Sequence, residues 1–368
     1  MLNIITERKF IELGAEVPTT IGGEYKVSIV DTNRGNVEFF PFGDTWHKNL
    51  ILNRGLESFI VPYYVGIWGN RPPSLSKIFF TNSGNGIFWG ASTGTSAAAV
   101  VATQTGLQGT LRQTSTTNVV GSGLTIDDMV TGSRSMQVAT QFAATAVRIT
   151  DINEAVINSA FISSQSATPF SRFVFPSTIT LEIGQYLIIT YRITGSIPSI
   201  VTDIPVSVSS NGFDASGTIR TVGTYDNLFG GIDANGGSGI MGSCYPYVTS
   251  NYPSYTNVAY SGTSYMLSAT AAFPAAGSAL STSAVGTGVS MTASGNLYAT
   301  PYVSGSKQST INLMFPAGNP AATTNIGGIL LNGTNGTSYG TMWKFNTPQA
   351  KDAGKVLVAS LTYSFAAA

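Results

Sequence analysis

Residues 171–194 read SRFVFPSTITLEIGQYLIITYRIT, with apolar side chains at alternate positions on both sides of Gly184-Gln185. Before this turn the alternating residues are Ile179, Leu181 and Ile183, and after it they are Leu187, Ile189, Tyr191 and Ile193. A period of two is typical of β-strands that bury one face. We therefore predict that residues 179–193 form a hairpin of two paired strands whose inward side chains belong to the core.

Other segments give weaker structural signals. Residues 24–30 and 36–40 alternate around the turn residues 31–35 and predict a β-hairpin, and residues 356–365 predict a closing strand. The best helix signal is in residues 49–60, where Leu52, Leu56, Phe59 and Ile60 recur at helical spacing. Gly55 counts against this helix by about 1 kcal/mol of propensity.

Dense turn signals with a single helix indicate a mainly β protein built of β-sandwich or jelly-roll-like domains with one or two short helices. We place a boundary near residue 200, where the charge density drops. Residues 1–199 are predicted to form an N-terminal β domain with one short helix near 50–60. Residues 200–368 are predicted to form a low-charge β domain, rich in Gly, Ser and Tyr, that ends in the closing strand.

The chain is poor in charge. Charged residues make up 10% of its 368 residues, against about 25% in a typical globular protein, and 18 basic residues balance 18 acidic ones. Residues 1–200 hold 26 of these 36 charges. Because a soluble monomer relies on surface charge for colloidal stability, this composition favours a surface that is covered by neighbouring molecules. The absence of a basic excess argues against nucleic-acid binding.

We expect the chain to be made in a cytoplasm and not to be exported by the general secretory route. No stretch approaches the roughly 18 consecutive apolar residues of a membrane span, so membrane insertion is not expected. The first 14 residues include Glu7, Arg8, Lys9 and Glu12, where a signal peptide would be apolar. Cys244 is the only cysteine and is expected to be a small buried or half-buried apolar residue, because it can form neither an intrachain disulfide nor a cysteine-based zinc site.

No recognisable catalytic arrangement is present. His47 is the only histidine, and its neighbours Trp46 and Lys48 favour a packed surface residue over a catalytic one. Acid pairs that act on glycans need no histidine, so glycan depolymerisation stays open as the one enzymatic alternative. The candidate acids are Asp127-Asp128, Asp151 with Glu154, and the isolated Asp214, Asp226 and Asp233. We nevertheless predict no catalytic residue, no cofactor and no metal site.

A set of tyrosines falls in the least charged part of the chain. Tyrosine combines an apolar ring with a polar tip, which suits subunit contacts, β packing and stacking on glycans. Contact or packing is our first interpretation, and a glycan-stacking surface is the alternative. The set comprises Tyr245, Tyr247, Tyr252, Tyr255, Tyr260 and Tyr265.

Three places in the chain resemble a family of tailed-bacteriophage virion proteins, described as tail-fibre or minor structural proteins. The first is GEYKVSIV at 23–30 followed by NLILNRGLE at 49–57, similar to the family's opening. The second joins ITDINE at 149–154, FSR at 170–172 and the alternating segment 179–194, and the third joins KFNTP at 344–348 to the closing strand. These places cover about a quarter of the chain. The family often ends with an aromatic residue and Arg, whereas this chain ends Phe365-Ala-Ala-Ala368.

The resemblance implies a structural virion component, tail- or neck-associated, that forms a symmetric oligomer and docks to other virion proteins. Its expected location is the virion, after synthesis in the cytoplasm of a bacterial host. A receptor-binding protein that recognises host surface glycan is the alternative. Residues 221–306 carry only two charges, Asp226 and Asp233, and we expect a neighbouring subunit or virion protein to cover much of their surface.

Overall fold

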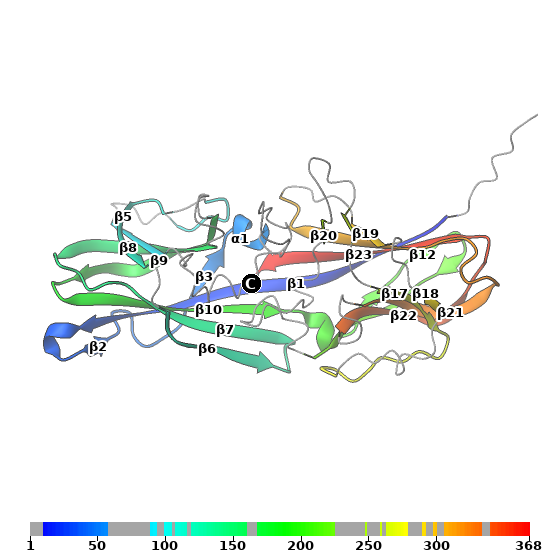
Figure 1. Cartoon of the computed structure of the whole chain (residues 1–368), viewed down its shortest axis with the longest axis horizontal. Helices are drawn as coiled ribbons and strands as arrows, with labels where there is room; N and C mark the ends of the chain where they lie inside the picture. The colour runs from blue at the N-terminus through cyan, green and yellow to red at the C-terminus, as the bar shows by residue number, and fades with distance from the viewer. Residues whose placement is uncertain are drawn as a thin grey trace, which may run out of the picture.

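The computed structural model shows an elongated molecule in which one long strand runs through most of the length (Figure 1). The structure describes residues 10–57, 89–93, 99–104, 107–115, 119–159, 168–224, 247–248, 258–259, 263–278, 289–291, 297–299, 305–332 and 339–368. Nearly all regular structure in these ranges is β, which confirms the mainly β prediction. None of the helices in the described part of the chain is long and apolar enough to cross a membrane.

The long strand β1 (Phe10–Asp31) belongs to two halves of the molecule. Its first part pairs in parallel with β23 (Val356–Ala367), from Phe10↔Val356 to Ile21↔Ala367. Its second part pairs antiparallel with β10 (Gln185–Ser196), from Thr20↔Ser196 to Asp31↔Gln185. We name the region around β10 and the preceding strand β9 (Thr168–Leu181) the β9–β10 half, and the region around β23 and the preceding strand β22 (Tyr339–Lys351) the β22–β23 half. The predicted closing strand is confirmed, and it closes the molecule onto its first strand.

The β9–β10 half is a sandwich of two layers. One layer contains the second part of β1, β10, β7 (Ser133–Gln141), β6 (Val119–Asp128) and the short β2 (Val37–Phe39). The facing layer contains β9 (Thr168–Leu181), β8 (Ile149–Ser159), β4 (Trp89–Thr93) and β5 (Thr110–Ser115). Strand β3 (His47–Ile51) pairs with β1 at its start and with β9 at its end, so it links the layers.

The β22–β23 half is a second sandwich, drawn on the right of Figure 1. Its first layer continues from β1 and β23 through β20 (Gln308–Phe315), β19 (Leu297–Ala299), β16 (Val258–Ala259) and β15 (Tyr247–Val248). Its second layer has the order β11 (Ile204–Val206), β14 (Gly217–Gly223), β22 (Tyr339–Lys351), β21 (Thr324–Asn332), β17 (Thr263–Ser268), β18 (Val289–Met291). The turn strands β12 (Ser209–Ser210) and β13 (Phe213–Asp214) form a separate hairpin.

The predicted hairpin at 179–193 is wrong in its pairing. Strand β9 pairs with β8 and β3, whereas β10 pairs with β1 and β7. The two strands follow each other across the sandwich and bury their alternating side chains against each other, so Leu181 and Ile189 are both fully buried. The period of two was read correctly, but it does not reveal whether the next strand lies beside the first or opposite it. Ile183 is 60% exposed because it belongs to the turn.

The hairpin predicted at 24–40 is confirmed by the pairing of β1 with β2, in which Ile29 lies opposite Phe39. Its turn contains the 3-10 helix η1 (Thr32–Arg34), and Asp31 caps it by accepting a hydrogen bond from the backbone N–H of Asn33. Gly35 and Asn36 follow with positive φ angles of 75° and 64°, which suit these residue types. A further 3-10 helix, η2 (Pro198–Ile200), joins the two halves of the molecule.

The predicted helix at 49–60 is shorter than expected. Residues 47–51 are strand β3, because pairing with β1 and β9 overrides the helical spacing. Helix α1 covers Asn53–Glu57, and residues 58–60 lie outside the described ranges. Gly55 has a positive role here: a Cβ at this position would lie 2.3 Å from the carbonyl oxygen of Phe170. The glycine therefore allows the helix to pack directly on β9.

The layers of both halves meet in one continuous apolar core. In the β9–β10 half, the ring of Tyr25 stacks on Phe173 of the opposite layer with ring centroids 4.2 Å apart. In the β22–β23 half, the indole of Trp343 is fully buried and its Nε1–H donates to the carbonyl of Ala215 at 3.0 Å. The division into two domains near residue 200 stays a prediction; the pairing shows that β1 contributes to both halves.

Candidate functional site

The adjacent acids Asp127 and Asp128 stabilise the hairpin of β6 and β7. Asp127 receives two hydrogen bonds from the buried Arg134, from Nε at 2.5 Å and from Nη2 at 2.8 Å. Asp128 accepts hydrogen bonds from Thr131 and from the backbone N–H of Val130. The hydrogen bond from the Thr131 hydroxyl is the main reason why the pKa of Asp128 is held below its usual value. Both carboxylates thus complete a turn.

The other candidate acids lie apart. Asp151 is exposed, with a positive φ of 61°, whereas Glu154 in the same strand is buried, so these two carboxyl groups do not form an acid pair. Asp214 accepts a hydrogen bond from the backbone N–H of Ser216, and hydrogen bonding to Ser216 lowers its pKa. Asp203 forms an ion pair with Arg220 at 2.7 Å. Asp226 and Asp233 lie outside the described residues.

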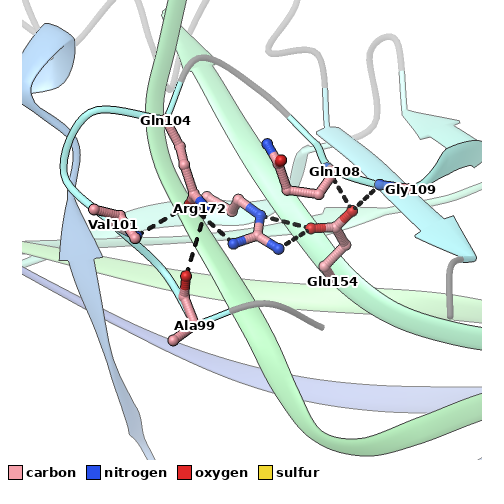
Figure 2. A network of polar contacts seen from close by, with 7 residues as sticks. All are labelled: Ala99, Val101, Gln104, Gln108, Gly109, Glu154 and Arg172. Carbon is pink, nitrogen blue, oxygen red and sulfur yellow. Dashed lines mark hydrogen bonds and ion pairs between the residues drawn. The ribbon is translucent and has the colours of Figure 1, made fainter. Parts of the chain in front are cut away.

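Glu154 and Arg172 form the most deeply buried ion pair among the described residues, with side chains 1% and 0% exposed. They lie on the adjacent strands β8 and β9 (Figure 2). Arg172 donates from Nε to the Oε2 atom of Glu154 at 2.5 Å, and its Nη2 atom forms an ion-pair contact with the same oxygen. The other carboxylate oxygen, Oε1, accepts from the backbone N–H groups of Gln108 and Gly109 at 2.8 and 2.6 Å.

The same pair fixes the segment 99–104. Arg172 Nη1 donates to Oε1 of Gln104 at 2.9 Å, and that oxygen also accepts from the backbone N–H of Val101 at 3.1 Å. Figure 2 shows this segment curving over β9, with Gln104 reaching down to Arg172. The carbonyl of Ala102 also accepts from the backbone N–H of Asn53 at the start of α1. The segment that carries the exposed Val101 is therefore held by two contacts, one with Arg172 of β9 and one with Asn53 at the start of α1.

This arrangement is suited to structure rather than to chemistry. A catalytic carboxyl must reach substrate, but both oxygens of Glu154 accept protein hydrogen bonds in a solvent-free position. Removing two charges from water costs several kcal/mol for each ion, which the mutual attraction must offset. The structural effect of the ion pair is that it fixes two neighbouring backbone segments, 99–104 and 108–109. The sequence did not predict this pairing, because β9 is buried on both faces at Arg172 and no periodicity marks the residue.

His47 is a packed residue, as predicted. Its ring stacks on Tyr25 with centroids 5.4 Å apart and meets the edge of Phe42 at 6.1 Å. Burial raises the pKa of Tyr25 to about 12, and the Tyr25 hydroxyl donates to the carbonyl of Val174 in the opposite layer. Nearby, the buried Tyr191 donates to Oδ1 of Asn49 at 3.1 Å. These polar groups connect the two layers of the β9–β10 half.

The tyrosine set is only partly described. Tyr265 of β17 is half-buried and packs against a small apolar cluster with Val222, Leu267 and Met342. Tyr247 lies in β15. Tyr245, Tyr252, Tyr255 and Tyr260, with Cys244, lie outside the described residues. For Tyr265 the packing interpretation holds, and for the others both interpretations stay predictions, as does the covering of residues 221–306.

Exposed apolar side chains gather at one end of the β9–β10 half. Three turns meet there, at residues 32–40, 145–148 and 182–184, on the left of Figure 1. We name this region the end surface. Its large apolar side chains are Val37, Phe39, Val147 and Ile183, exposed by 51%, 42%, 63% and 60%, whereas the ring of the neighbouring Phe40 lies against the Lys26 ammonium. The sequence analysis missed this surface; the apolar pair Phe39-Phe40 before Pro41 was the one signal for it.

A second, smaller group of exposed apolar residues lies at the turn between β6 and β7. It contains Ile126, Met129 and Val130, of which Val130 is 85% exposed. In the ranges that the structure describes, no group of three or more His, Cys, Asp or Glu side chains is placed to hold a metal ion.

Comparison with protein-family models, with curated proteins and with solved structures found no match to this chain.

Proposed function

We propose that this chain is a structural, non-catalytic component of a tailed-phage virion, tail- or neck-associated, that assembles with copies of itself and docks to other virion proteins. The observation that carries the proposal is the group of large exposed apolar side chains at one end of an elongated double sandwich. Exposed groups of large apolar side chains in soluble proteins often mark sites of contact with other proteins. The low charge of the whole chain supports the same interpretation.

The described acids also support an assembly role. Asp127, Asp128, Asp203 and Asp214 act in ion pairs, turns or caps, and Glu154 is enclosed by protein donors. The two family-like segments 149–154 and 170–172 meet at the Glu154–Arg172 pair, so the residues that carry the resemblance lie in the framework of the fold. A framework role suits a protein that must hold its shape inside a larger particle.

The proposal is tested on particles of the phage that encodes the chain. Purified virions are analysed by quantitative mass spectrometry, and antibody-labelled virions are imaged to locate the protein. We expect a fixed copy number for each particle and label at the tail or neck. Presence of the protein in infected cells with no signal in purified virions would contradict a structural role. Release of reducing sugar from host polysaccharide, abolished by replacing an Asp, would instead identify a depolymerase.

A further inference from the structure

We draw no further inference here: the strongest candidate, the apolar end surface formed by Val37, Phe39, Val147 and Ile183 at one end of the β9–β10 half, carries no proposal because nothing in the structure shows what covers it.

Discussion

The two halves of the molecule bury charge in different ways. In the β9–β10 half, Arg172 is neutralised by the carboxylate of Glu154. In the β22–β23 half, the fully buried Lys351 is surrounded by backbone dipoles, since its Nζ donates to the carbonyls of Pro316, Asp352 and Lys355 at 3.3, 3.3 and 2.6 Å. One half pairs opposite charges across two strands, and the other solvates a single cation with its own main chain.

The comparison shows where buried polar side chains are needed in a β protein. Sheet ladders satisfy their own backbone groups, but irregular segments do not. Glu154 accepts from residues 108 and 109, Arg172 positions Gln104, and Lys351 closes the turns at 316 and 352–355. In both halves the buried charge therefore lies where a loop meets the sandwich.

The largest effect is expected from breaking the ion pair. Arg172→Met removes the guanidinium partner of the buried Glu154 carboxylate, and removal of one partner of such a pair costs about 3–5 kcal/mol. Urea denaturation of the purified chain measures this loss. The double variant Arg172→Met with Glu154→Leu should recover part of it, because no uncompensated charge stays buried.

The exposed pair Arg148–Glu182 is the matched control, with side chains 59% and 55% exposed. Arg148→Met should change the free energy of unfolding by at most about 1 kcal/mol, because solvent screens exposed pairs. A similar loss for Arg172→Met and Arg148→Met would show that burial does not distinguish the two pairs.

The next effect concerns the strands β9 and β10, which lie in facing layers of the sandwich. Leu181→Ala and Ile189→Ala each remove a fully buried side chain, which costs about 2–5 kcal/mol. Denaturant unfolding of both variants provides the measurement. Losses below about 0.5 kcal/mol at both positions would contradict their place in the core. Ile183→Ala is the control from the same alternating pattern, and we expect a change within about 0.5 kcal/mol because Ile183 is 60% exposed.

These strands also show what a sequence can predict about this fold. The alternation at 179–193 correctly predicted two strands and, apart from Ile183, the residues that they bury, because side-chain direction follows directly from strand geometry. It failed on the pairing, since the same pattern suits a hairpin and a crossing between layers. The partner of β10 is β1, more than 150 residues away, and nothing local encodes that contact.

The candidate site was less predictable than the fold. Glu154 and Arg172 were noticed within one of the three places of resemblance, but their ion pair depends on the register of β8 and β9, which includes several bulges. Gly55 was counted against a helix, whereas the close approach to Phe170 requires it. Ile183 was predicted to be core and is exposed, because the turn carries it beyond the facing layer. Each error arose where tertiary contact decides the role of the residue.

A smaller, pH-dependent effect is expected from Tyr25. Burial raises its pKa from 10.0 to about 12, so above pH 10 the folded chain binds more protons than the unfolded chain. The stabilisation by the neutral phenol is complete below pH 10 and is lost as the pH rises towards 12, at about 1.4 kcal/mol for each unit. Denaturation at several alkaline pH values measures this slope.

Tyr25→Phe should flatten that alkaline slope, at the cost of about 0.5–1.5 kcal/mol at neutral pH for the lost hydrogen bond to Val174. Burial also raises the pKa of Tyr191, so part of the slope should persist in the variant. An equally steep slope in the variant and in the wild-type chain would show that Tyr25 does not titrate as its position implies.

The β22–β23 half should respond to alkaline pH in the opposite direction. Burial lowers the pKa of Lys351 below its usual 10.5, although the nearby Asp352 acts the other way. Between the lowered pKa and 10.5 the unfolded chain binds more protons than the folded chain, so this lysine makes the free energy of unfolding rise with pH.

Lys351→Met should remove that rise and cost about 1–3 kcal/mol at neutral pH, because three carbonyls lose their donor. Denaturation of the wild-type and Met variants from pH 8 to about pH 10, below the loss from Tyr25, isolates the rise. A difference in the free energy of unfolding between the two chains that stays constant with pH would contradict this prediction. The three carbonyls would then solvate the ammonium as well as water does, and the two halves would differ only in the geometry around their buried charges.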